Sequence, residues 1–234
     1  MEKLFEKSMK IGSIAAAYPG AIEIFLNYNI DFCCGGDRPL EEALKEKNLN
    51  EAEVIDRINA GYQEFLKRID KGIDWRNSSM SELIDYIVNK HHTYLKGELP
   101  VAQRLLTKIL DVHFYHSGEV LSRLFKLYMN LMAELEIHLL KEEEILFPII
   151  KEYEANPAEE LRLKAVEVMT ETEDEHEGAG DILKEMREIT NNYTCPPEGC
   201  MTFQRTYDTL VEIEQDLFNH IHLENNILFP RLKK

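Results

Sequence analysis

The chain has 234 residues and a mass of 27.3 kDa, and 44% of its residues are hydrophobic and 30% are charged. This length and composition fit one large globular domain, or one domain with a small companion, and exclude collagen-like and low-complexity chains. The net charge of −16 opposes contact with a phosphate backbone or an anionic membrane surface, so we expect neither nucleic acid nor a membrane as a partner.

The first part of the chain, residues 1–72, is predicted to be a small helical domain. Apolar residues recur at helical spacing on both sides of a turn at Tyr18-Pro19-Gly20. The segment Asp31-Phe-Cys-Cys-Gly-Gly36 follows, and charged helices should begin near Pro39 and Asn50. Adjacent cysteines are not typical of a secreted disulfide framework, which favours a cytoplasmic protein.

A second domain is predicted over residues 79–234, after a linker. Ser79 and Glu82 have the spacing of a capping box, which indicates the start of a helix. Long helices with short connections predict an all-α fold, an antiparallel four-helix bundle. The expected helices span residues 80–98, 101–115, 118–147, 158–190 and 202–229. The expected breaks lie at Leu99-Pro100, Gly118, Pro148, Asn156-Pro157 and the loop Cys195–Cys200.

An internal repeat is the most informative feature of the sequence. The segment His138-Leu-Leu-Lys-Glu142-Glu-Glu-Ile-Leu-Phe-Pro148 recurs as His220-Ile-His-Leu-Glu224-Asn-Asn-Ile-Leu-Phe-Pro230. In both copies the histidine and the glutamate continue an apolar stripe whose steps are three and four residues, so we expect them to face the bundle interior. The helix before the second copy carries His176 in its own stripe. The chain therefore contains a duplicated helix pair.

Buried imidazoles and carboxylates in this arrangement predict a metal site. An unpaired buried carboxylate costs several kcal/mol, roughly, and metal ions compensate for it directly. Residues four apart on one helix can bind the same ion, and a glutamate can bridge two ions. Two such helices can therefore hold a dinuclear centre, with His176 and one residue of the pair His91 and His92 as further ligands. Periodicity does not choose between His91 and His92.

These motifs resemble the hemerythrin-like di-iron bundle, and most closely the bacterial iron-sulfur-cluster repair di-iron proteins. In that family a domain with Asp-Phe/Tyr-Cys-Cys-Gly-Gly precedes the bundle, as residues 31–36 do here, and the linker carries Asp-Trp-Arg, as residues 74–76 do. The resemblance covers essentially the whole chain. The first metal histidine of the family stands seven residues before a Leu-Pro pair, which selects His92. The resemblance implies these metal ligands: His92, His138, Glu142, His176, His220 and Glu224.

The resemblance also implies a function. It implies two iron ions, oxo-bridged when oxidised, and the repair of iron-sulfur clusters damaged by nitric oxide or oxidants. Damaged iron-sulfur proteins or the cluster assembly machinery would be the partners, and nitric oxide or oxygen the small ligand. Cys33 and Cys34 match the cysteine pair of the family, with a thiol role in nitric oxide or redox chemistry. Glu134 and Glu175 match acidic residues that line access to the site.

Several alternatives stay open at this point. The protein could donate iron, or act as an enzyme that reduces nitric oxide to nitrous oxide, or be a hemerythrin-type oxygen or redox carrier or sensor. The cysteine pair could also be two small buried side chains with no chemical role. We expect the remaining acidic residues, Glu143 among them, to form a solvated face, and His222 to be a surface residue or to support a ligand. Both a monomer and a homodimer are compatible with the sequence.

Overall fold

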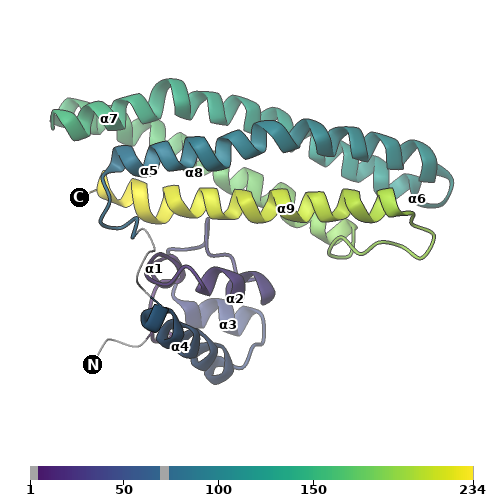
Figure 1. Cartoon of the computed structure of the whole chain (residues 1–234), viewed down its shortest axis with the longest axis horizontal. Coiled ribbons are helices and arrows are strands. Elements are labelled where there is room, and N and C mark those ends of the chain that lie inside the picture. Colours follow the sequence, from purple (N-terminus) through teal and green to yellow (C-terminus); the bar gives the residue numbers. More distant parts are fainter. Residues whose placement is uncertain (1–4, 69–73, 234) are drawn as a thin grey trace. The chain divides into compact units, whose positions relative to one another are not determined.

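The computed structural model describes residues 5–68 and 74–233, and they form helices joined by short connections (Figure 1). No β-strand occurs among them, although one isolated bridge joins Lys10 and Pro39. The predicted all-α fold is therefore confirmed. The predicted domain boundary at residue 72 and linker residues 71–73 lie outside the described residues. Within the described ranges, no helix is both long and apolar enough to cross a membrane.

The chain divides into two compact units, which are residues 1–83 with 218–234 and residues 84–217. We call the first the smaller unit and the second the larger unit. The helices of the smaller unit pack around buried apolar residues such as Ile14, Phe25 and Leu44. Four helices lie in its N-terminal part: α1 (Ile11–Ala17), α2 (Ala21–Asn27), α3 (Leu40–Glu46) and α4 (Glu51–Arg68).

Two asparagines end the short helices of the smaller unit. Asn29 after α2 and Asn48 after α3 both have a φ of 51°, in the left-handed region that asparagine tolerates better than most residues. The amide of Ile30 then bonds to the carbonyl of Phe25 at 2.8 Å, as in a Schellman motif. These local signals keep the helices short, so the chain turns once between α2 and the cysteine pair and again after α3.

The larger unit is built from long helices. Helix α5 (Met80–Tyr86) begins in the smaller unit and leads into the larger one. The predicted capping box is present, since the amide of Glu82 bonds to Ser79 Oγ at 3.1 Å and the amide of Ser79 to Glu82 Oε2 at 3.0 Å. The helices that follow are η1 (Ile87–His92), α6 (Thr93–Lys141), η2 (Glu142–Leu146), α7 (Phe147–Ala155), α8 (Glu159–Ile189) and α9 (Met201–Leu223).

Helix α6 folds back on itself, so that its two halves form separate long helical segments (Figure 1). The hydroxyl of Tyr128 donates a 2.7 Å hydrogen bond to the carbonyl of Leu99. These residues are 29 positions apart, a separation of about 43 Å in a straight helix. The backbone is helical at the predicted break at Gly118, and the chain reverses between Leu99 and Tyr128. The Tyr128–Leu99 bond ties the two halves together.

Three predicted breaks do not end helices: Gly118, which lies inside α6, and the two prolines Pro100 and Pro148. Pro100 lies inside α6, where a proline costs about 3 kcal/mol. Buried residues continue on both sides of it, including Leu95, Leu99, Ala102 and Leu106, and their packing outweighs that cost. Pro148 opens α7 instead of ending the helix before it, and the chain stays helical to Ala155.

Three π-helical segments lie at the predicted metal ligands. The segment η1 ends at His92, η2 begins at Glu142, and η3 (Glu224–Leu228) begins at Glu224. In both copies of the sequence repeat the π segment precedes Phe-Pro, and after the second copy a short 3₁₀ turn, η4 (Phe229–Arg231), follows. Single π turns inside α-helices are frequent at functional sites.

Candidate metal centre

Three predicted histidine ligands of the larger unit converge on the carboxylate of a fourth predicted ligand, Glu142. The Nε2 atoms of His92 and His138 each lie 3.4 Å from Glu142 Oε2, and Nε2 of His176 lies 4.0 Å from Glu142 Oε1. The Nε2 atoms of His138 and His176 are 3.1 Å apart. None of the four side chains is more than 4% exposed. Three imidazole nitrogens therefore face one buried carboxylate.

Carboxylates behind two of these rings set their orientation. Nδ1 of His92 lies 2.8 Å from Glu143 Oε1, and Nδ1 of His138 lies 2.8 Å from Glu175 Oε2. The hydrogen bond with His138 lowers the pKa of Glu175 to about 2. Lys141 contributes to this shift, and partial burial opposes it. Each ring can therefore donate its Nδ1–H outward and present its Nε2 lone pair to the site, which is how metal-binding histidines are commonly held.

Glu143 corrects the expectation of a solvated face. Its side chain is 21% exposed, and it contacts both His92 and Lys96. Sequence reasoning missed this residue because Glu143 follows Glu142 directly, inside η2, where the α-helical period does not apply. A run of three glutamates that begins with the predicted ligand Glu142 was the only signal available.

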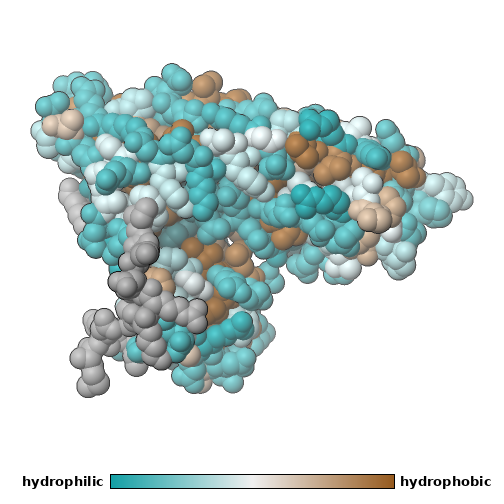
Figure 2. All heavy atoms as spheres, viewed as in Figure 1, coloured by the Kyte–Doolittle hydropathy of each residue, from teal (hydrophilic) through white to brown (hydrophobic). Residues whose placement is uncertain are grey.

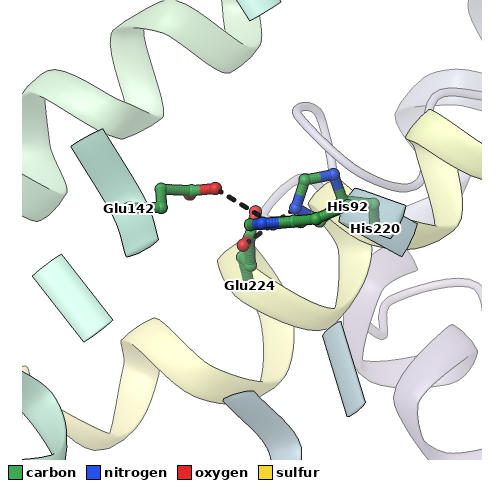
Figure 3. Close-up of side chains that lie close together, drawn as sticks. All are labelled: His92, Glu142, His220 and Glu224. Atoms are coloured by element: carbon green, nitrogen blue, oxygen red, sulfur yellow. Dashed lines mark hydrogen bonds and ion pairs between the residues drawn. The ribbon is translucent and has the colours of Figure 1, made fainter. Parts of the chain in front are cut away.

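The last two predicted ligands lie where α9 ends. His220 and Glu224 are both fully buried, and Nε2 of His220 lies 3.0 Å from Glu224 Oε1. Ligand atoms lie within 4.8 Å of one another in the group His92, Glu142, His220 and Glu224 (Figure 3). A second group that meets the same limit is His138, Glu142, His176 and Glu224. The two groups share Glu142 and Glu224 and together contain all six residues that the resemblance implied.

The donor set fits a pair of transition-metal ions. Each group offers two imidazoles and two carboxylates, and imidazole with carboxylate is a ligand set for iron, manganese or zinc. The shared glutamates each have two oxygens, so each could contribute a ligand atom to both groups. The outer carboxylates already hold two rings in the tautomer that binds metal.

The neighbouring histidine, His91, has a different environment from His92. Its Nδ1 lies 2.9 Å from Asp216 Oδ1, and its ring stands edge-on to Tyr86 with ring centroids 5.7 Å apart. His92 is the member of the pair whose Nε2 approaches Glu142. The geometry thus separates two residues that periodicity left equivalent.

The cysteine pair of the smaller unit lies in a loop held by Asp31. Asp31 Oδ1 accepts bonds from the amides of Cys33 and Cys34 at 3.1 and 3.0 Å, and the two sulfurs are 3.8 Å apart. Both cysteines are free thiols, Cys33 buried and Cys34 half-buried. The hydrogen bond with Cys34 and burial raise the pKa of Cys33. Asp31, Cys33 and Cys34 form a further group whose ligand atoms lie within 4.8 Å of one another.

The end of the chain contacts this loop inside the smaller unit. Nδ2 of Asn226 donates to the carbonyls of Phe32 and Cys33, both at 3.2 Å. Nδ1 of His222 lies 3.2 Å from the same nitrogen, and burial lowers the pKa of His222 to about 4, so its ring is a neutral acceptor. His222 is 2% exposed, which excludes a surface position. Glu134, the other predicted access residue, is exposed on α6 one turn before His138, and its role stays a prediction.

Both parts of the chain match known protein families. Residues 7–62 match the ScdA_N family, a domain of unknown function, and residues 83–232 match the hemerythrin HHE cation binding domain. A probable iron-sulfur cluster repair protein of Haemophilus influenzae is 39% identical over 226 residues, which is 95% of this chain and 96% of that protein. This chain belongs to the YtfE/ScdA family of iron-sulfur cluster repair proteins.

Other members of the family are similar over the same length. The iron-sulfur cluster repair protein YtfE of Shigella boydii is 38% identical and that of Escherichia coli 37% identical, each over 225 residues and 96% of both chains. The HHE match spans every predicted ligand from His92 to Glu224. The ScdA_N match includes the Asp31–Cys34 loop. Family membership thus confirms the resemblance inferred from the sequence motifs.

Proposed function

We propose that this protein repairs iron-sulfur clusters damaged by nitric oxide or oxidants, through a di-iron centre held by His92, His138, Glu142, His176, His220 and Glu224. The observation that carries the proposal is the pair of His/His/Glu/Glu groups that share two glutamates. The repair role is supported by the names of the relatives, which match along the whole chain. Damaged iron-sulfur proteins or the assembly machinery are the partners, and the domains are residues 1–72 and 79–234.

Iron supplies redox chemistry and coordination positions for small ligands such as nitric oxide or oxygen. The residues of this chain orient the ligands and exclude water. Glu143 and Glu175 hold the outer nitrogens of His92 and His138, and the buried helices exclude water from the donor atoms. Lys96 forms an ion pair with Glu143, and Lys141 forms one with Glu175, so the negative charges of these two carboxylates are balanced.

The donor set also supports a role in which iron is the cargo. Six side-chain ligands shared between two ions leave coordination positions open. An iron ion held in this way can be released more easily than one whose coordination sphere is filled by protein ligands. The cysteine pair adds soft sulfur ligands beside the Asp31 carboxylate. We therefore extend the proposal to iron donation to damaged clusters, with Cys33 and Cys34 in a thiol or redox role.

The first experiment measures iron, manganese and zinc in anaerobically purified protein and records an optical spectrum before and after reduction. We expect about two iron ions per chain and visible bands that bleach on reduction. Glu142→Gln and Glu224→Gln should lose iron, whereas Glu144→Gln, an exposed neighbour on η2, should keep it. Zinc alone, or equal iron in all variants, would contradict the centre.

The second experiment tests repair in cells that lack this gene. After exposure to nitric oxide, the wild-type chain should restore the activity of an iron-sulfur dehydratase, and the Glu142→Gln variant should not. His116→Ala is the matched control, since His116 is an exposed histidine of α6. If Glu142→Gln restores activity as well as the wild type does, the metal centre is not the agent of repair. Release of nitrous oxide under turnover would instead favour nitric oxide reduction.

A further inference from the structure

A thiol and an imidazole form a pair at the start of α9, within the larger unit and apart from the metal centre. Sγ of Cys200 lies 3.2 Å from Nε2 of His113, which comes from the first half of α6. Cys200 is exposed, whereas His113 is buried and stands edge-on to Phe203 with ring centroids 5.2 Å apart. Figure 1 shows that α9 begins at the end of the bundle where α6 turns back. A fixed imidazole therefore faces an accessible sulfur.

The surroundings of Cys200 stabilise its thiolate. The sulfur accepts bonds from His113 and from the amides of Phe203 and Thr202, in the first turn of α9, and these contacts lower the pKa of Cys200 to about 7. A helix N-terminus and a neighbouring imidazole are the features that activate cysteines in proteins. At neutral pH a large share of Cys200 is therefore the nucleophilic form.

A second cysteine lies in the same loop. Sγ of Cys195 packs directly against Gly199, because a Cβ atom built on Gly199 would lie 2.3 Å from it. The amide of Gly199 bonds to the carbonyl of Pro196 at 2.8 Å, so the chain reverses between the two cysteines. Burial, with the charges of Cys200, Asp208 and Glu198, raises the pKa of Cys195. The loop thus pairs a thiol of lowered pKa with a thiol of raised pKa.

We propose that Cys200 is a redox-reactive thiol that attacks small-molecule disulfides, that His113 positions and activates it, and that Cys195 completes the exchange. In the first step the Cys200 thiolate forms a bond to one sulfur of a disulfide RSSR, the RS–SR bond breaks, and one RS⁻ leaves. In the second step Cys195 loses its proton and attacks Sγ of Cys200, which releases the second RS⁻. The two protein thiols are oxidised to one disulfide, and RSSR is reduced to two RSH.

The order of the two steps follows from the two environments. The thiolate with the lower pKa is present first and attacks first. Once Cys200 is in a mixed disulfide its negative charge is gone, so one of the contributions that raises the pKa of Cys195 disappears. The first step therefore prepares the second.

The exposed side chains around the pair indicate which disulfide to use as a probe. Val112, Phe114 and Tyr115 flank His113 in sequence, Met201 follows Cys200, and all four are at least 64% exposed. Figure 2 shows apolar, brown side chains on the visible face toward the same end of the bundle. A neutral aromatic disulfide suits this surface better than a charged one, so the probe is dithiodipyridine, whose released thione is measured by absorbance.

The experiment treats the reduced full-length protein with dithiodipyridine and locates the modified sulfurs by peptide mass spectrometry. We expect Cys200 to react before Cys33 and Cys34, and the Cys195–Cys200 disulfide to follow, with two thiones released per loop. Cys200→Ser should abolish both products. Cys195→Ser should stop at a mixed disulfide on Cys200 with one thione. Iron content should be the same in all variants, since neither cysteine lies in the metal centre.

The role of His113 is tested by the pH profile of His113→Asn. The wild-type rate should rise with a midpoint near pH 7, whereas the midpoint of the variant should move up toward the usual cysteine value of about 8.5 without reaching it, because the amides of Phe203 and Thr202 still contact the sulfur. The variant should be slower at pH 7, by at most about threefold, yet faster at pH 10, by at most about fourfold, because a more basic thiolate is the better nucleophile. A merely structural role of His113 would not produce this crossover. Equal profiles for both proteins, faster labelling of Cys34, or a lasting mixed disulfide in the wild type would each overturn the proposal.

Discussion

Asn226 donates a 3.2 Å hydrogen bond to the backbone carbonyl of Cys33, although 193 residues separate them in the sequence. Two glycines make room for the asparagine. A Cβ atom on Gly12 would lie 1.9 Å from Asn226 Oδ1, and a Cβ atom on Gly36 would lie 2.4 Å from it. Asn226 stands two residues after the predicted ligand Glu224. The loop of the cysteine pair and the end of the chain are therefore fitted to each other.

The Asn226→Ala substitution should destabilise the smaller unit by about 1–3 kcal/mol, because the carbonyls of Phe32 and Cys33 lose a donor. We also expect faster alkylation of Cys33, which is buried only while the loop is in place. Chemical denaturation and timed alkylation measure the two effects. Unchanged stability with unchanged alkylation would show that the hydrogen bonds do not hold the loop.

A double-mutant cycle tests the fit itself. Gly12→Ala should destabilise the wild-type protein, because its methyl group meets the Asn226 amide, and should be far better tolerated in the Asn226→Ala background. Gly97→Ala, where a Cβ atom meets nothing within 4 Å, is the control and should be neutral or stabilising. Additive effects of the two substitutions would mean that the contact is not what requires a glycine.

The outer carboxylates should control metal affinity. Glu143→Gln and Glu175→Gln each weaken the bond that orients a histidine, so iron affinity should fall about 10–100-fold. Competition with a chelator of known affinity measures the change, and Glu144→Gln serves as the exposed control. Equal affinities in the three variants would show that the rings are held by packing alone.

The parts of the fold that could be predicted from the sequence depend on local signals. The apolar stripes placed His138 and Glu142 in the interior, since a period of three and four residues is a property of one helix. The capping box at Ser79 was found for the same reason, and it is present. The two copies of the repeat also fold alike, each with a π segment at its glutamate.

Other features depend on partners far along the chain and left no local signal. Pro100 is tolerated inside a helix because the packed residues on both sides of it continue one stripe, and Tyr128 secures the turn of α6 through the carbonyl of Leu99. The contact of Asn226 with the cysteine loop, and that of Cys200 with His113, join segments that no motif links. Sequence patterns predict which face of a helix is buried, but they do not predict which residues pack against that face.

Metal binding should stabilise the fold through Glu142 and Glu224. Because ions bind only the folded chain, iron should raise Tm by several degrees in the wild type, roughly in line with its affinity and concentration. Glu142→Ala and Glu224→Ala should remove most of this increase, whereas Glu144→Ala should keep it. Calorimetry with and without chelator measures the difference. An equal increase in Tm in all four proteins would contradict the assignment of Glu142 and Glu224 as ligands.

A buried ion pair away from the metal should make stability depend on pH. Glu214 is fully buried, where it pairs with Arg187 and accepts a 2.8 Å bond from the hydroxyl of Tyr193. Burial, only partly opposed by Arg187 and Tyr193, raises the pKa of Glu214. The folded state therefore binds this proton more tightly than the unfolded state, and the contribution of Glu214 to stability falls as the pH rises through its folded pKa.

Arg187→Met removes the counter-charge and should enlarge that effect. The buried carboxylate then lacks its partner, so we expect a loss of about 3 kcal/mol or more at pH 7.5. The loss should shrink toward pH 5, because Glu214 without Arg187 takes up a proton and becomes neutral. The double variant Arg187→Met/Glu214→Gln should have a much flatter profile, since neither member of this pair then carries a charge. Denaturant unfolding between pH 5 and 8 gives these curves, and a deficit that does not change with pH would show that Arg187 acts through packing instead of charge.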